Sequence, residues 1–302
     1  MWIVFAIGSA LFAGLNAILA KLGIRKTDST LATALRTIVV VLFAWLMVFI
    51  THAQSGLADM SFKTFLFLIL SGLATGASWL CYFKAIQTGP VAQVAAVDKS
   101  STVLTIVLAF VLLKETVSAF SAAGVVLIGL GTFLMLDPNP FAARLSGQNK
   151  SSNQETNKIA SSCSPHWIWF AIGAAAFASL SAITGKIGID QIDSNLGTAV
   201  RTLVVLVMAW LMVFITHKQK ALSAISRKEM AFILLSGVAT GASWLCYYRA
   251  LHTGPASAVV SIDKLSILVT VAFSVGVLHE KLSWKSGLGL AVQTIGTLLM
   301  LL

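Results

Sequence analysis

The sequence is an internal repeat in which each half contains an odd number of candidate membrane spans. Residues 2–136 align without a gap onto residues 167–301, each equivalent lying 165 positions later, and about half of the aligned positions are identical. Identity at this level indicates a duplication rather than a shared apolar composition. An odd number of spans requires the two halves to cross the membrane in opposite senses, so the chain predicts an inverted repeat.

Ten apolar segments, five in each half, are long enough to cross about 30 Å of hydrocarbon as helices of about 20 residues. They lie near residues 2–20, 31–51, 62–83, 91–113, 118–136, 167–185, 196–216, 229–248, 256–278 and 284–302. With 57% hydrophobic and 11% charged residues among 302, the chain has too little polar surface for a soluble domain. The predicted fold class is an all-α polytopic membrane protein of ten transmembrane helices in two inverted five-helix repeats. The predicted domains are a first repeat at 1–136, a polar linker at 137–165 and a second repeat at 166–302.

The charged residues indicate topology rather than nucleic-acid binding. The net charge is +10, but lysine and arginine are scattered at span ends and do not form one basic face. Loops of the two halves carry opposite positive biases, which supports the inversion and places both termini outside. Cys81, Cys246 and Cys163 have no spacing typical of a disulfide framework or a metal site. We therefore expect no metal, no cofactor and no nucleic-acid partner.

A motif that occurs in both halves resembles a known family. Its first copy is SGLATGASWLCY at 71–82, TGP at 88–90, Asp98-Lys99 and Glu115, and its second copy lies at 236–247, 253–255, 263–264 and 280. The chain resembles the EamA domain of the drug/metabolite transporter superfamily, as if two small bacterial or archaeal five-span members were fused. The resemblance implies a ten-helix transporter in the inner membrane of a bacterial or archaeal cell, with a substrate cavity between the repeats and alternating access. It also implies cytoplasmic termini, the opposite of the charge-based orientation, and leaves the substrate open.

Two charged pairs are expected near the middle of the bilayer. Asp98-Lys99 and Asp263-Lys264 follow a proline by eight or nine residues, which places them roughly 12 Å into the membrane. Charges at that depth are costly unless they face water, a partner or a substrate. We predict that Lys99 and Lys264 bind substrate and that Asp98 and Asp263 exchange protons. The alternative is a purely structural pairing between the repeats, Asp98 with Lys264 or Lys99 with Asp263.

The third span of each repeat carries hydroxyl groups along one helical face. The residues are Ser71, Thr75, Ser78 and Tyr82, with Ser236, Thr240, Ser243 and Tyr247 as their copies. The neighbouring glycines are typical of close helix packing. Ser78, Ser243, Tyr82, Tyr247, Trp79 and Trp244 are candidate cavity residues, the tryptophans by stacking on substrate. For the tryptophans, plain packing is an equal alternative.

Further charged residues lie nearer the span ends. Arg36 and Arg201, roughly 7 Å deep, are candidate anion-binding groups, with snorkelling to the headgroups as the alternative. Glu115 and Glu280 are predicted to cap or gate the junction of the fourth and fifth spans. Lys21 and Lys186 are predicted to be interface anchors.

These features predict a secondary active transporter, because the sequence lacks a phosphate-binding loop for ATP. An enzyme is not expected, because the candidate charges are deep and duplicated rather than clustered at one interface. The expected partners are the lipid bilayer, protons and a small anionic or zwitterionic metabolite. The sequence is compatible with a homodimer and does not determine the oligomeric state. The alternatives are a membrane-embedded enzyme acting on a lipid-linked substrate and a passive channel. Four differences between the halves could make substrate recognition asymmetric, with drift at lipid-facing positions as an equal alternative. They are Asn16 and Ser181, Gln93 and Ala258, Ser100 and Leu265, Ile128 and Gln293.

Overall fold

The computed structural model describes residues 2–58, 60–113, 119–136, 166–189, 192–253, 262–263 and 265–299, and over these ranges the chain is helical. The first repeat contains α1 (Trp2–Gly23), α2 (Ser29–Ile50), the 3₁₀ helix η1 (Ala53–Leu57), α3 (Phe62–Thr88), α4 (Val91–Lys99), α5 (Ser101–Leu113) and α6 (Ala119–Met135). The second contains α9 (Trp167–Ile189), α10 (Ser194–Ile215), η2 (Lys218–Ala224), α11 (Arg227–Thr253), α13 (Ser266–Leu278) and α14 (Trp284–Leu299).

Most of these helices have the length and composition of membrane spans. In the described part of the chain, seven helical segments are long and apolar enough to cross a membrane. One of them, Val91–Leu108, comprises α4 and the first part of α5. Two shorter apolar helices are Ala122–Met135 and Ser266–Leu278. These observations confirm an all-α polytopic membrane protein, while the count of ten spans stays a prediction.

The second helix of each repeat begins at an aspartate. The Asp28 carboxylate accepts from the backbone N–H of Thr30 at 2.9 Å, and Asp193 accepts from Asn195 at 2.8 Å. A side-chain acceptor at this position satisfies backbone donors that have no partner within the helix. The same local signal therefore starts α2 and α10 at equivalent positions.

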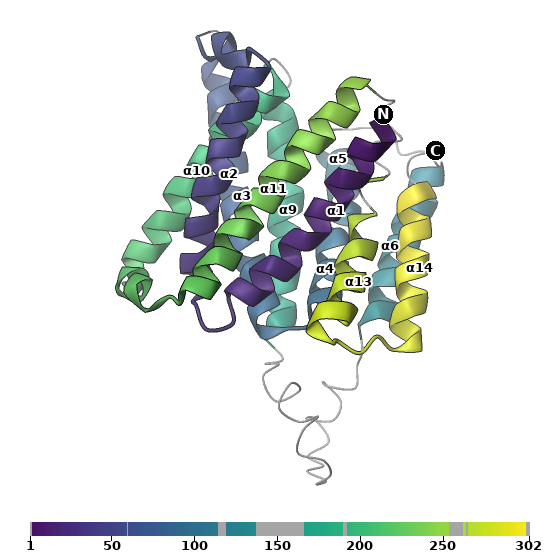
Figure 1. The fold of residues 1–302 in the computed structure, drawn as a ribbon. Coiled ribbons are helices and arrows are strands. Elements are labelled where there is room, and N and C mark those ends of the chain that lie inside the picture. Colours follow the sequence, from purple (N-terminus) through teal and green to yellow (C-terminus); the bar gives the residue numbers. More distant parts are fainter. Residues whose placement is uncertain are drawn as a thin grey trace.

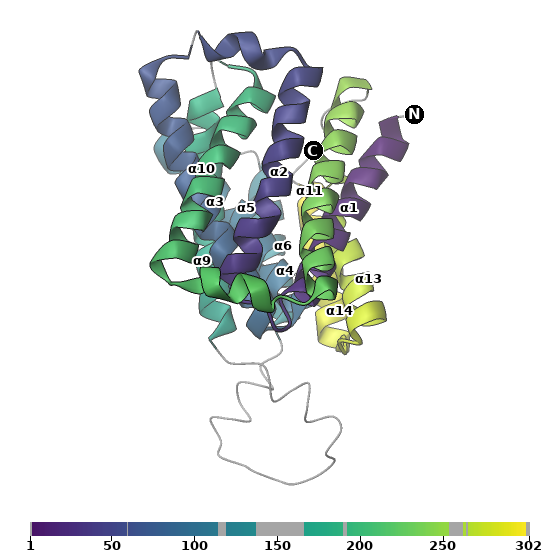
Figure 2. The ribbon, with the colours of Figure 1, turned by 60° about the vertical axis from the view of Figure 1, so that its left-hand side comes forward.

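The first helix of each repeat packs against the third helix of the other. The end of α3 at Gly89 lies beside Trp167 at the start of α9, and Leu68 near the start of α3 lies beside Gly188 near the end of α9. The two helices are therefore antiparallel. The pair α1 and α11 has the same arrangement, with Gly23 at the end of α1 beside Ile233 near the start of α11. Figures 1 and 2 both show α1 running alongside α11.

The second and last helices pair with their own repeat equivalents. α2 packs against α10, and α6 packs against α14. Both pairs are antiparallel: Gly131 of α6 lies beside Gly289 and Gln293, and Met135 beside Gly289. A helix can pack antiparallel against its own equivalent in this way when a two-fold pseudo-axis runs perpendicular to the helices. The axis then lies in the membrane plane, as in inverted-repeat transporters. Figure 1 shows the start of α1 and the end of α14 at the same end of the bundle.

The predicted fourth span, residues 91–113, is not one continuous helix. It divides at Ser100 into α4 and α5. The Ser100 N–H donates to the carbonyls of Ala96 and Val97, and the Val103 N–H donates to the Ser100 carbonyl at 2.9 Å, a three-residue step. The second repeat has the same three-residue bonds on both sides of Leu265. The break therefore belongs to both repeats and does not depend on serine.

Candidate functional site

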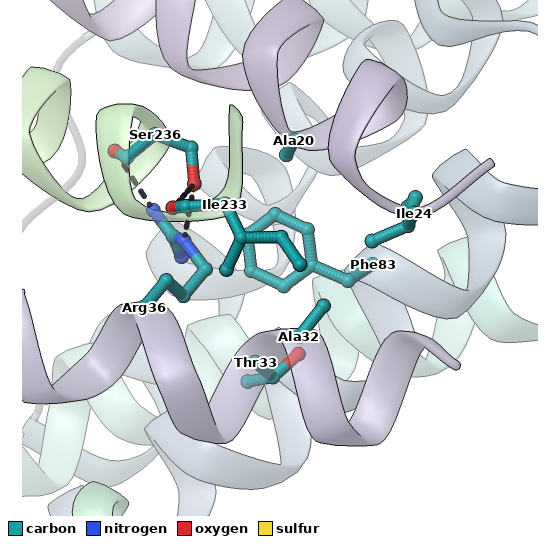
Figure 3. A pocket seen from close by; sticks show the side chains of 8 residues that line it. All are labelled: Ala20, Ile24, Ala32, Thr33, Arg36, Phe83, Ile233 and Ser236. Atoms are coloured by element: carbon teal, nitrogen blue, oxygen red, sulfur yellow. Dashed lines mark hydrogen bonds between the residues drawn. The ribbon is translucent and has the colours of Figure 1, made fainter. Parts of the chain in front are cut away.

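The structure places Arg36 of α2 inside the protein, against the second repeat. Its side chain is 3% exposed, so it does not snorkel to the surface. Its Nε donates to Ser236 Oγ at 3.1 Å and its Nη2 donates to Thr240 Oγ1 at 2.7 Å, both on α11. Nη2 also donates to Asn16 Oδ1 on α1 at 2.8 Å. Figure 3 shows the guanidinium turned toward Ser236. The guanidinium therefore joins α1 and α2 of the first repeat to α11 of the second.

Aromatic rings of α3 also contact the guanidinium. The Arg36 Cζ lies 4.4 Å from the ring centroid of Phe83 and 5.2 Å from that of Trp79. Both distances are typical of cation–π contacts, in which the ring quadrupole attracts the cation. Tyr82 packs edge-on against Phe83, with ring centroids 5.3 Å apart. Trp79 and Tyr82 thus belong to the Arg36 environment.

The described groups in contact with Arg36 are all neutral. An arginine side chain keeps its positive charge in proteins, and burial of an unbalanced charge is costly. Hydroxyl, amide and aromatic groups offset part of that cost without neutralising the cation. These contacts therefore leave the guanidinium positively charged, and an anion with two acceptor oxygens would match its planar fork.

A small pocket lies beside Arg36. It is too narrow to hold a water molecule. Its lining is labelled in Figure 3: Ala20, Ile24, Ala32, Thr33, Arg36, Phe83, Ile233 and Ser236. In this conformation the pocket is closed, and a ligand could bind there only after the surrounding helices separate.

The equivalent arginine occupies a similar place in the other half. A Cβ atom added to Gly185 of α9 would lie 2.8 Å from Arg201 Nη1 and 3.0 Å from Ser71 Oγ. Arg201 therefore lies beside Ser71, as Arg36 lies beside Ser236. Ser181 stands at the position of Asn16 and bonds Thr75 Oγ1 at 2.5 Å. Arg36 and Arg201 thus have related but unequal surroundings.

The hydroxyl stripe of α3 faces α9. Ser71 Oγ donates to the Ser181 carbonyl at 2.8 Å, and Ser78 Oγ donates to the Ala174 carbonyl at 2.8 Å. Trp244 packs against the cluster formed by Ala44, Val48, Ala53, Leu196 and Ala199, and Tyr247 packs against the buried pair Ala6 and Ala250. The candidate residues of the third spans are therefore divided between the Arg36 environment and the interfaces between repeats.

The charges at the helix breaks contact hydroxyl groups of other helices. Lys99 Nζ donates to Ser266 Oγ at the start of α13, at 3.3 Å. Asp263 Oδ1 accepts from Ser9 Oγ of α1 at 2.6 Å. Among the described side chains, Lys99 and Asp263 do not form an ion pair within 4 Å. Lys264 lies outside the described residues, and so does the alternative pairing of Asp98 with Lys264.

Two charged residues hold the junction between α3 and α4. Lys21 donates to the carbonyls of Ile86 and Gly89 at the end of α3, at 2.8 Å to Gly89. Glu280 accepts from the first backbone N–H groups of α4, at 2.8 Å to Val91, and also from Ser274 Oγ. A cation at a helix C-terminus and an anion at a helix N-terminus both complement the helix dipole. Lys21 thus binds helix ends inside the fold, and the headgroup role expected for it does not describe its contacts. Glu115 lies outside the described residues.

Sequence reasoning did not assign a site role to Asn16, Phe83 or Ser9. Asn16 appears in the sequence as one of four differences between the halves. Ser9 shows the same signal, because its equivalent is Ala174. For Asn16 and Ser9, the sequence signal was therefore a difference between equivalent positions of the two repeats.

The fold and the buried charges define a class: a membrane transporter built from two inverted repeats. Comparisons with known proteins give the family. The model of the EamA-like transporter family matches residues 1–137 and again 165–302, so the chain belongs to this family.

Individual proteins are similar to the chain at two levels. A protein of Sinorhizobium sp., described as "Uncharacterized transporter in cobO 3'region", is 42% identical over 137 residues, which are 45% of this chain and 97% of that protein. That relative therefore has the length of a single repeat. A solved structure described only as a crystal structure of a protein superposes with a TM-score of 0.60 at 14% identity, over 98% of this chain and 94% of the other. This second similarity concerns the fold alone.

Proposed function

We propose that the protein is a secondary active transporter that moves a small anionic or zwitterionic metabolite by alternating access, and that Arg36 binds the anionic group. The observation that carries the proposal is the buried guanidinium with neutral partners. Its charge favours an anion electrostatically, and its contacts come from both repeats. Relative motion of the repeats would therefore open and rebuild the binding site, which is the requirement for alternating access.

In this proposal, protons are the ions whose gradient drives transport of the substrate. Asp98 and Asp263 lie at the helix breaks, where half-helix ends and unwound backbone form ion and substrate sites in inverted-repeat transporters. A carboxylate there can change its charge by protonation. Proton uptake and substrate binding would then be linked through the positive charge of the site.

A binding screen tests the substrate class. The purified protein is heated with a panel of carboxylates, phosphates and zwitterionic metabolites, because a compound that binds only the folded state raises the apparent Tm. A stabilising compound should lose at least about tenfold in affinity in Arg36→Gln, since hydrogen bonds to charged groups contribute about 1.5–3 kcal/mol. The exposed Arg25→Gln variant is the control and should bind as wild type. Equal binding by Arg36→Gln would refute the role of Arg36.

Transport of the stabilising compound tests the mechanism. In vesicles containing the purified protein, a proton gradient should drive accumulation of the compound above its external concentration. Equilibration without accumulation, at any imposed gradient, would instead indicate a passive channel.

A further inference from the structure

A carboxylate and two hydroxyl groups from different segments meet near the second helix break. Ser9 Oγ of α1 donates to Asp263 Oδ1 at 2.6 Å and lies 3.2 Å from Ser243 Oγ of α11. Ser243 Oγ also donates to the Ser9 carbonyl at 3.0 Å. Ser9 is fully buried and Ser243 is 6% exposed, while Asp263 is half-buried. Protein groups therefore hold one oxygen of the carboxylate.

This arrangement provides hydrogen bonds for both protonation states of Asp263. When Asp263 is a carboxylate, the single hydrogen of Ser9 Oγ can point to it across the distance of 2.6 Å between the two oxygens. When Asp263 is protonated, the carboxyl O–H can donate to Ser9 Oγ. The Ser9 hydrogen can then turn to Ser243 Oγ, whose own hydrogen already binds the Ser9 carbonyl. A hydroxyl can serve in this way because it carries one donor and two acceptor lone pairs.

The equivalent place in the first repeat lacks the central hydroxyl. Ala174 occupies the position of Ser9, and Ser78 occupies that of Ser243. Ser78 Oγ donates to the Ala174 carbonyl at 2.8 Å, so the contact between the two helices is the same as in the other half. At this contact between the two helices, the halves therefore differ in the side chain at one position.

Among the described residues, the charged and titratable groups near Asp263 come from three elements. α4 ends with Asp98 and Lys99, and Lys99 binds Ser266, three positions after Asp263. Tyr247 of α11 packs against the same buried pair, Ala6 and Ala250, as Ile262 does. α1 brings Ser9, and its charged residue Lys21 lies at the far end of the helix. Among the described side chains Asp263 forms no ion pair within 4 Å.

We propose that Asp263 is the carboxylate that takes up and releases the coupling proton, and that Ser9 is its positioning residue. The proton comes from water on one side of the membrane and returns to water on the other, and no covalent bond other than the carboxyl O–H forms or breaks. The assignment rests on the proton coupling of the proposed function and names the group that carries it.

Infrared spectroscopy of the protein in lipid vesicles tests the assignment without any substrate. The C=O stretch of a protonated carboxyl group is followed during a pH titration of the wild type. The band assigned to Asp263 should disappear in Asp263→Asn and persist in the control variant Asp193→Asn, which changes the aspartate that caps α10. In Ser9→Ala the frequency of the band should change, because the carboxyl O–H loses its acceptor.

Two further variants separate a positioning role from a structural one. Ser9→Thr keeps the hydroxyl and should restore the wild-type band. Ala174→Ser alters the other half and should leave the Asp263 band unchanged. A band that survives in Asp263→Asn, or a Ser9→Ala band at the wild-type frequency, would overturn the proposal. If the band behaves as expected while a proton gradient fails to drive transport, the protonation of Asp263 and the positioning role of Ser9 stand, but that proton is not a coupling proton and the proposed function fails.

Discussion

At the scale of single residues, the two repeats use the same positions with different side chains. Asn16 accepts a hydrogen bond from the buried guanidinium of Arg36, while Ser181 at the same position bonds Ser71 and Thr75. One contact involves a charged donor and the other involves neutral hydroxyls. The residue pairs that differ between the halves therefore mark chemical differences within the bundle.

Replacing these two residues by alanine should have unequal effects. Asn16→Ala leaves a buried, charged N–H group without its acceptor, and we expect a loss of about 1.5–3 kcal/mol in the free energy of unfolding. Ser181→Ala removes neutral hydrogen bonds and should cost about 0.5–1.5 kcal/mol. Denaturant titration of both variants in the same detergent measures the difference. Equal losses would contradict a special role for the guanidinium contact.

At the scale of elements, short sequence signals set where helices begin, and charges near their ends connect the repeats. Asp28 both starts α2 and forms an ion pair with Lys218 of η2, at 2.8 Å. Asp193 starts α10 in the same way, but the position equivalent to Lys218 is Ala53. The ion pair is therefore present on one side of the pseudo-symmetric structure only.

The two aspartates form a matched pair for a pH experiment. Burial raises the pKa of Asp28, but its hydrogen bond and charge interaction with Lys218 and its bonds to backbone N–H groups lower the pKa below its ordinary value. The ionised form therefore stabilises the fold above the ordinary pKa of the unfolded chain. That contribution disappears as pH falls through the lower pKa of the folded state.

We expect Asp28→Asn to keep the helix cap and to lose less than about 1 kcal/mol at neutral pH, because the pair is partly exposed and screened. The loss should vanish in acid. Asp28→Ala should lose about 1 kcal/mol more than Asp28→Asn, because it also lacks the helix cap. Asp193→Ala, which lacks the equivalent cap, should lose about 1 kcal/mol relative to the wild type. Thermal unfolding at neutral and acidic pH measures these effects. An Asp28→Asn deficit that persists in acid would argue against the ion pair.

Close packing of α6 against α14 depends on particular glycines. A Cβ added at Gly131 would lie 2.5 Å from the Gln293 backbone N and 2.6 Å from the Gly289 carbonyl, so Gly131→Ala should cost about 1–3 kcal/mol. Gly129, two residues earlier on α6, has no atom within 4 Å of such a Cβ. Gly129→Ala should therefore be neutral or stabilising by up to about 1 kcal/mol. Comparison of the two melting temperatures checks the packing.

At the scale of the whole molecule, the first helix of each repeat crosses to the third helix of the other. Each half therefore supplies part of the other half's interior, and the helices around Arg36 come from both. A five-helix repeat by itself would leave those faces unpaired. The curated relative with the length of one repeat would need a second copy of itself to bury the same surfaces.

A cross-link between the repeats tests this arrangement and the motion. A Cβ at Gly8 of α1 would lie 3.9 Å from the Cβ and 3.4 Å from the Sγ of Cys246 on α11. Cβ atoms of disulfides are about 3.5–4.5 Å apart, so Gly8→Cys should form a disulfide with Cys246 under oxidation. The two halves should then stay joined after protease cleavage at a site introduced between them, and separate on reduction.

The cross-link should also stop transport reversibly, because alternating access requires the repeats to move against each other. Gly8→Cys combined with Cys246→Ser is the control and should neither cross-link nor lose activity on oxidation. Failure of the first variant to cross-link would contradict the antiparallel pairing of α1 with α11.

The sequence by itself determined the membrane class, the all-helical fold and, as a prediction, the repeat boundaries. Each depends on local composition or on the repetition of the chain. The tertiary structure alone decided that Arg36 is buried against Ser236, Thr240 and the rings of α3, because these groups lie far apart in the sequence. It also decided that the fourth span divides at Ser100, that Lys21 binds the end of α3, and that Ser9 meets Asp263. Such contacts depend on which helix faces pack together, and a periodic apolar pattern leaves that choice open until the helices of both repeats are assembled.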